Sequence, residues 1–138
     1  MSVVLIFTHQ IDAAWPSVSP LLQKAIDRSG DDVSTGDLWA MLRAGQAFLI
    51  VAVNDDAPVM ASVWRFERWH EGQVFKCLCL GGADIGEWIE EFNEKILKMM
   101  SEGGATRLVF EGRKGWPHWF AKVGHKVREL RSTYIMEL

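Results

Sequence analysis

Hydrophobic and polar residues follow two different periods along the chain, and each change of period indicates a new element. A short apolar run at residues 3–7 predicts a first strand that is buried on both sides. Apolar residues at helical spacing begin at Trp15 and predict a first helix. Ser34 and Asp37 then have the spacing of a capping box, which predicts a second helix that stops at Gly45.

Three extended runs occupy the middle of the chain. They span residues 47–53, 59–68 and 73–80, and turn-forming residues such as Asp55 and Gly72 separate them. Because short connections join antiparallel neighbours, we predict a three-stranded antiparallel meander.

The helix signal is clearest after this meander. Apolar residues recur every three or four positions from Ile85 to Met100, and charged residues cover the opposite face. Gly103 and Gly104 end this helix, and residues 106–111 predict a short strand. A strand, a helix and a strand in this order predict a right-handed crossover between parallel strands.

The remaining residues predict one short helix and two further strands. The helix covers about residues 116–123, and the strands are expected at residues 127–130 and 133–138. The predicted order is β-α-α-β-β-β-α-β-α-β-β, an α/β (α+β) fold with a mixed central sheet of about seven strands and helices on both faces. Since no repeat or linker interrupts it, residues 1–138 are expected to form a single domain.

Composition and charge narrow the classes of function. The chain is 49% hydrophobic and 24% charged, with a formal net charge of −3 and interleaved acidic and basic residues. Because no basic stripe is present, nucleic-acid binding is disfavoured. No apolar run approaches the roughly 18 residues of a membrane helix, and the first residues lack the features of a signal peptide, so neither a membrane span nor export is expected.

The cysteines and histidines give no sign of a metal or redox site. Cys77 and Cys79 lie two apart in a predicted strand, where their side chains share a face and do not suit a disulfide, which favours a reducing, cytoplasmic setting. The four histidines lie on separate predicted elements, so no metal site is predicted. A nucleophile elbow, a P-loop and a dinucleotide fingerprint are also missing.

Three local segments carry a resemblance to a known family. Residues 74–80 form a strand that leads into GGADIG at residues 81–86, and residues 107–111 form another strand. WFAKVGH at residues 119–125 looks like a helix that ends in Leu-Tyr-x-x-x-Gly-Phe. Together with the order of elements, these segments resemble the GNAT superfamily of N-acetyltransferases. EGRKGW at residues 111–116 is also similar to the E-G-R-x-G-W segment of small phage and prophage proteins of this type.

This resemblance implies a V-shaped opening between the fourth and fifth strands that takes acetyl-coenzyme A (acetyl-CoA). The pantetheine arm would pair with the strand backbone, and the pyrophosphate would lie on backbone N–H groups at the start of the following helix. The implied cofactor-binding residues are Cys79, Leu80, Gly81, Gly82, Ala83, Ile85, Gly86 and Arg113.

Three positions depart from the family pattern. Leu78 stands where the pyrophosphate signature has Arg or Gln. Asp84 puts a carboxylate at the helix start, where it competes with a diphosphate, so the alternative is a plain turn with Asp84 as the N-cap. Phe120 stands where the family usually has the tyrosine that protonates the departing thiolate, and Phe has no proton to give.

Two residues are predicted to be catalytic. Glu111 ends the fifth predicted strand facing the expected cleft and is the predicted base for an attacking amine, while the alternative is an ion pair with Arg113 or Lys114. Tyr134 is the only tyrosine. It acts as an acid only if the final predicted hairpin folds over the cleft, and otherwise it is an ordinary strand aromatic.

Two functions follow from these residues. The first is an N-acetyltransferase in which an unidentified small-molecule or protein amine attacks acetyl-CoA directly. The second is an inactive GNAT-shaped binding or assembly protein of phage origin that acts through protein contacts. Trp64, Phe66 and Trp69 lie on or beside one predicted hairpin, where an exposed aromatic face would suit a homodimer or a phage or host partner. Core packing is the alternative for these rings.

Overall fold

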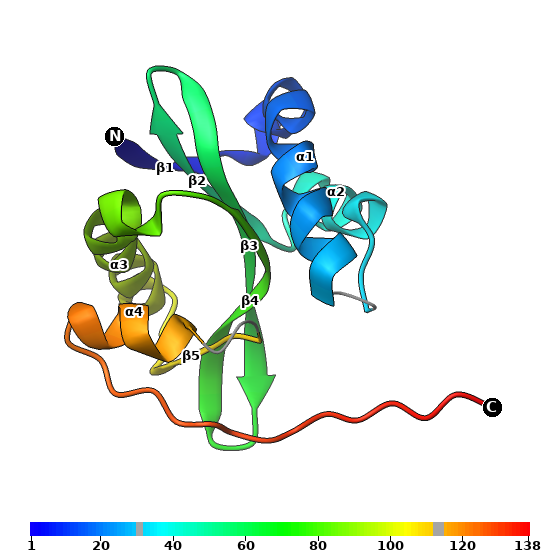
Figure 1. Cartoon of the computed structure of the whole chain (residues 1–138), viewed down its shortest axis with the longest axis vertical. Helices are drawn as coiled ribbons and strands as arrows, with labels where there is room; N and C mark the ends of the chain where they lie inside the picture. Colours follow the sequence, from blue (N-terminus) through cyan, green and yellow to red (C-terminus); the bar gives the residue numbers. More distant parts are fainter. Residues whose placement is uncertain (30–31, 112–114) are drawn as a thin grey trace.

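The structure of this protein, a computed structural model, describes residues 1–29, 32–111 and 115–138. In these residues five strands form one sheet, in the order β1-β2-β3-β4-β5, with four α-helices packed on its two faces (Figure 1). The strands are β1 (Ser2–Ile6), β2 (Phe48–Asn54), β3 (Ala57–Trp69), β4 (Gly72–Gly82) and β5 (Arg107–Val109). The helices are α1 (Ile11–Ser29), α2 (Thr35–Arg43), α3 (Ile85–Glu102) and α4 (Trp116–Lys122), and the 3-10 helix η1 (Thr8–Gln10) precedes α1.

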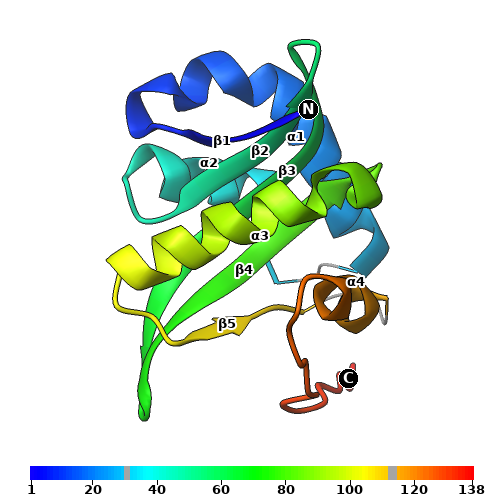
Figure 2. The same ribbon diagram turned by 90° about the vertical axis from the view of Figure 1, so that its left-hand side faces the viewer.

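Strands β1 to β4 pair antiparallel in chain order, so the predicted meander is confirmed. Helix α3 then crosses one face of the sheet, and β5 returns parallel to β4 (Figure 2). None of the helices in the described ranges is long and apolar enough to cross a membrane.

Each face of the sheet has its own hydrophobic core. Leu22 of α1 and Leu38 of α2 pack with Leu49 and Val63 on one face. On the other face, the predicted apolar stripe of α3 packs against the rings of β3 and β4. The main residues of this second core are Trp64, Phe75, Trp88, Phe92 and Ile96. Strand residues alternate between the two cores because successive side chains point to opposite faces.

A bulge in β4 interrupts this alternation. Val63 pairs with Cys79 and Trp64 pairs with Cys77, so Leu78 is an extra residue in β4. As a result Leu78 and Cys79 both pack towards α1, whereas Cys77 is buried towards α3. The prediction that the two cysteines share a face is therefore wrong, because the bulge changes which face each following residue occupies.

The aromatic residues of the β3–β4 hairpin lie mainly in the core. Trp64 is 1% exposed and stacks on Phe75 with ring centroids 5.0 Å apart, and Phe66 packs on the same ring. Trp69 points to the opposite face of the sheet from Phe66. Trp64 and Phe66 therefore do not form the predicted exposed aromatic face. The alternative prediction, that these rings pack in the core, is confirmed for both of them.

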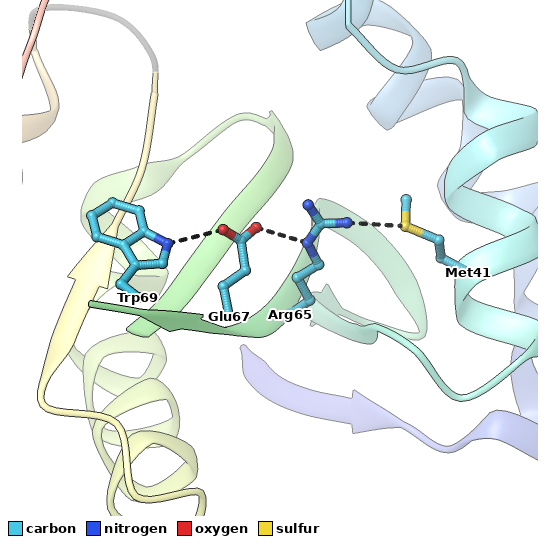
Figure 3. Close-up of polar contacts among 4 residues, drawn as sticks. All are labelled: Met41, Arg65, Glu67 and Trp69. Carbon is cyan, nitrogen blue, oxygen red and sulfur yellow. Dashed lines mark hydrogen bonds and ion pairs between the residues drawn. The ribbon is translucent and has the colours of Figure 1, made fainter. Parts of the chain in front are cut away.

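A row of polar contacts runs from Trp69 along the other face of β3 (Figure 3). The indole N–H of Trp69 donates to Glu67 at 3.1 Å, and the Arg65 Nε donates to the same carboxylate at 2.8 Å. Burial alone would raise the pKa of the Glu67 carboxyl, but the hydrogen bonds from Trp69 and Arg65 hold it below its ordinary value. Arg65 also reaches the sulfur of Met41 on α2, which links the hairpin to that helix.

The C-terminal segment contains no strand. The prediction of strands at residues 127–130 and 133–138 is wrong, and the described sheet has five strands in place of about seven. The apolar pattern favours extended backbone there, but extended backbone forms a strand only where another strand accepts its hydrogen bonds. In Figure 1 the segment, drawn in orange to red, leaves α4 and crosses the end of the β3–β4 hairpin, where Arg131 lies over the Trp69 ring, before it reaches the C-terminus.

Gly81 allows the backbone of β4 to lie directly against α1. A Cβ atom at this position would collide with the carbonyl oxygen of Leu21, whereas one at Gly86 would meet only the Trp119 ring, at 3.5 Å. We therefore expect Gly81→Ala to lower the free energy of unfolding by about 1–3 kcal/mol. The matched control Gly86→Ala should change it by less than about 1 kcal/mol. Urea unfolding measures both, and equal stability of the two variants would contradict this account.

A cleft between β4 and β5

The candidate functional site begins where β4 and β5 separate. The two strands pair only from Val74 to Lys76 on β4 and from Arg107 to Val109 on β5. Beyond this point β4 continues to Gly82 without a partner on its β5 side within the described residues. The separation opens a cavity of about 910 Å³ between β4, α1, α3 and residues on the C-terminal side of β5, among them Phe110, Glu111 and Trp116.

Aromatic side chains form one wall of this cavity. They are contributed by β3, by the inner face of α3, and by the segment from β5 through α4: Trp64, Trp88, Phe92, Phe110, Trp116, Trp119 and Phe120. Phe120 is buried and packs against Phe110 and Trp116, with ring centroids 5.0 and 5.7 Å away. These contacts hold α4 against the end of β5 and keep the wall apolar.

The start of α3 forms one end of the cavity. Asp84 precedes the helix with φ 60° and ψ 37°, and its carboxylate makes no capping hydrogen bond. It therefore does not act as the side-chain cap that the alternative interpretation predicted. The backbone N–H groups of Ile85 and Gly86 lie at the positive end of an 18-residue helix, which is a favourable place for an anion.

Contacts on either side of Asp84 position this helix start. The Ala83 N–H donates to the Val59 carbonyl at 2.9 Å, and the Trp88 indole N–H donates to the Ala83 carbonyl at 2.7 Å. Gly82, with φ +152°, has no room for a Cβ next to Val59 and Met60. Gly81 and Gly82 therefore have a clear packing role, while a Cβ at Gly86 would make only an ordinary van der Waals contact with the Trp119 ring.

Most of the predicted site residues are brought together in this cavity. Its lining includes Cys79, Leu80, Gly81, Gly82, Ala83, Ile85 and Glu111. Gly86 lies next to the lining residue Trp119. Tyr134 is 90% exposed in the C-terminal segment and does not line the cavity. Arg113 lies outside the described residues.

The cavity also has lining residues that the sequence did not indicate. Lys24 and Arg28 of α1, together with Asp32, place charges of both signs at its edge. Their helix packs against β4, which is remote in sequence, so no local pattern could reveal them. The apolar stripe from Ile85 to Met100 predicts only a core position for Trp88, whereas Trp88 also lines the cavity.

Neither thiol in the cavity is an effective nucleophile at neutral pH. Burial, and then the nearby carboxylate of Asp32, raise the pKa of the Cys79 thiol to about 11. The Cys79 Sγ points towards the Leu22 carbonyl of α1, at 3.7 Å. Burial, and then the neighbouring Cys79, also raise the pKa of the Cys77 thiol. Both thiols therefore stay protonated, and across the described ranges no three His, Cys, Asp or Glu side chains are grouped to hold a metal ion.

Comparison with known proteins identifies the fold. No protein-family model matches the chain, and no curated protein matches it in sequence. Three solved structures that match over nearly the whole chain are all acetyltransferases. A predicted acetyltransferase with acetyl-CoA from Clostridium acetobutylicum has a TM-score of 0.69 at 9% identity and covers 97% of this chain and 95% of its own.

The other two solved structures also match nearly the whole chain at low sequence identity. A ribosomal-protein-alanine N-acetyltransferase from Brucella melitensis has a TM-score of 0.64 at 12% identity, with 100% of both chains covered. An aminoglycoside acetyltransferase from an uncultured soil metagenomic sample has a TM-score of 0.71 at 9% identity, covering 99% of this chain and 95% of its own. The chain therefore has the fold of the GNAT acetyltransferases, as the resemblance of its sequence predicted.

The raised pKa of Cys79 predicts how its reactivity depends on pH. In a Cys77→Ala background, alkylation by iodoacetamide should be slow at neutral pH and should still be accelerating at pH 10, because the thiolate forms only towards its pKa of about 11. Adding Cys79→Ser to this background removes the remaining cysteine and measures the reaction of other groups with the reagent. Circular dichroism checks that the fold persists at each pH. A rate that levels off near pH 8.5, the pKa of a free cysteine, would contradict the burial of this thiol.

Proposed function

We propose that this protein transfers an acetyl group from acetyl-CoA to an amine. The separation of β4 from β5 next to the open start of α3 carries the proposal. It combines a strand edge that is unpaired among the described residues with an anion-binding helix end in one cavity. The fold supports it further, since the similar Clostridium structure contains acetyl-CoA.

The cavity suits each part of acetyl-CoA. The pantetheine arm carries two amide groups, which can pair with the free edge of β4 between Cys77 and Leu80. The pyrophosphate matches the N–H groups of Ile85 and Gly86, which the Asp84 carboxylate does not occupy. Bound acetyl-CoA supplies the thioester, and a backbone N–H near Leu80 would polarise its carbonyl.

Transfer would proceed by direct attack of the amine on the thioester. Because both cysteines stay protonated, an acetyl-cysteine intermediate is disfavoured. Glu111 is exposed among the lining residues of the cavity, shortly after the end of β5 at Val109, and we assign it the role of base for the attacking amine.

The departing thiolate has no tyrosine positioned to protonate it, which is the usual donor in the family that the sequence resembles. Phe120 has no proton to give, and Tyr134 could act only after a movement of the C-terminal segment. We therefore propose that the thiolate is released to water and that the reaction is slower than with a positioned acid.

The same features favour a second candidate function, a GNAT-shaped binding protein without catalysis. The buried Phe120 provides no acid, and the Asp84 carboxylate repels a diphosphate at the helix start. Cofactor binding distinguishes the two candidates.

Acetyl-CoA should stabilise the protein against heat. At 100 times its dissociation constant it adds about 2.7 kcal/mol, which raises the Tm of a domain of this size by several degrees. Gly86→Asp should abolish the shift, because it adds a carboxylate beside the pyrophosphate, whereas the matched variant Gly86→Ala should retain it. Differential scanning fluorimetry measures all three proteins. No shift in the wild type at millimolar acetyl-CoA would favour the binding protein over the enzyme.

Glu111→Gln should keep the acetyl-CoA shift and lower turnover. Loss of the base is expected to reduce kcat by about 100-fold or more, because the attacking amine then loses its proton acceptor. Release of free CoA thiol, measured with a chromogenic thiol reagent over a panel of amines, reports turnover. Glu90→Gln, on the exposed face of α3, is the control and should leave the rate unchanged. Unchanged turnover in Glu111→Gln would remove Glu111 from this role.

A further inference from the structure

Three charged residues at the end of α1 and just after it face the cavity without a partner in the fold. Lys24, Arg28 and Asp32 line the cavity, and all three residues are exposed. Lys24 and Arg28 are four residues apart on α1, so they lie on the same face of the helix. None of the three makes a hydrogen bond or ion pair within the described ranges. Their charges are therefore available to a bound molecule.

These residues approach the cavity from the side of the sheet opposite to α3. In Figure 1 α1 lies on one side of β4, whereas α3 and α4 lie on the other. Leu78 and Cys79 pack towards α1, and Cys77 and Leu80 pack on the α3 side, yet all four line the cavity. The cavity therefore passes between β4 and β5 from one face of the sheet to the other, and it has two mouths.

The mouth on the α1 side carries charges of both signs next to the free edge of β4. Burial, and then the Asp32 carboxylate, raise the pKa of the Cys79 thiol, so this carboxylate lies within electrostatic reach of the middle of that edge. Lys76 also lines the cavity, but it lies on the paired part of β4, near Glu67. Lys24 and Arg28 are thus the cations of the α1-side mouth in the described part of the chain.

The two mouths suit different molecules. In the proposed function the pyrophosphate of acetyl-CoA lies at Ile85 and Gly86, on the α3 side, which leaves Lys24 and Arg28 for the second substrate. A carboxylate binds an ammonium group, and a guanidinium binds a carboxylate or a phosphate through paired N–H groups. An amine without an anionic group would leave both cations unpaired, and a polyamine would be repelled by them.

We infer, resting on the proposed acetyl transfer, that the acceptor is a small amine that also carries an anionic group, such as an amino acid or an aminoalkyl phosphate. Lys24 and Arg28 bind the anionic group. Asp32 holds the amine beside the free edge of β4, where the proposed thioester lies. These three residues then determine the specificity for the acceptor, while Glu111 keeps the role of base.

Binding in the absence of acetyl-CoA tests this specificity independently of catalysis. The probes are ω-amino acids from glycine to aminocaproate, aminoalkyl phosphates of similar length, and the neutral amides of the same amino acids. Isothermal titration calorimetry should show at least one anionic probe binding about tenfold or more tightly than the matched amide, because the amide lacks the charge-assisted hydrogen bonds. The two anionic series show which anion is preferred. Equal affinity, or binding of no probe, overturns the inference.

Variants of the mouth identify the residues responsible. The double variant Lys24→Gln/Arg28→Gln should lose the preference for the anionic probe, and Asp32→Asn should weaken binding of the anionic probe and its amide alike. Lys98→Glu changes the net charge by the same amount as the double variant at an exposed position of α3 outside the cavity, and it should bind like the wild type. Circular dichroism checks the fold of each variant. A preference that survives the double variant, or that Lys98→Glu also loses, overturns the inference.

Thermal melting with acetyl-CoA shows which substrate the two cations bind. The double variant should keep the wild-type Tm shift, because the phosphates of acetyl-CoA lie on the α3 side. A lost shift would show that Lys24 and Arg28 bind the cofactor and would overturn the inference. If the anionic probe binds with the expected preference but the wild type shows neither a Tm shift with acetyl-CoA nor acetylation of the probe, the proposed transfer is wrong and the recognition of this ligand class stands.

Discussion

The structure depends on the unequal pairing of the two edges of β4. On one side β4 pairs with β3 from Gly72 to Gly82, and on the other it pairs with β5 only from Val74 to Lys76. The free part of that second edge is the floor of the cavity, and α3 begins directly after it. Close packing keeps this part of β4 in place without a second strand, because Gly81 lets the strand backbone lie against α1. The bulge at Leu78 turns Cys79 towards the same helix.

This arrangement supplies backbone groups that can bind a cofactor, whereas catalysis needs particular side chains in addition. A free strand edge and a helix start can hold an extended amide-containing molecule with a diphosphate through the backbone alone, so they place few demands on side chains. That is a physical reason why chains with only 9–12% identity can share this fold with acetyltransferases. Chemistry depends on individual side chains, and here Phe120 and the left-handed Asp84 distinguish this cavity from the family pattern.

Local patterns predicted the elements well where each element depends on its own residues. The capping box is confirmed, with the Ser34 N–H donating to Asp37 at 2.9 Å and the Asp37 N–H donating to Ser34 at 3.1 Å, since both bonds join residues three apart. The apolar stripe of α3 is confirmed for the same reason. The strand that precedes the cavity and the helix that follows it were also predicted, and they contribute most of the proposed cofactor contacts.

The sequence by itself thus determined the order of the helices and strands as far as α4, the presence of helices on both faces of the sheet and the segment that opens the cavity. Only the tertiary structure decided which face Cys79 occupies, that Gly81 and Gly82 are packed against the protein's own backbone, and that Lys24 of α1 lines the cavity. It also decided that the apolar C-terminal residues form no strand within this chain. Periodicity reports the preference of a segment for a conformation and a face, whereas a bulge, a close backbone contact or a strand pairing requires a second segment that is distant in sequence.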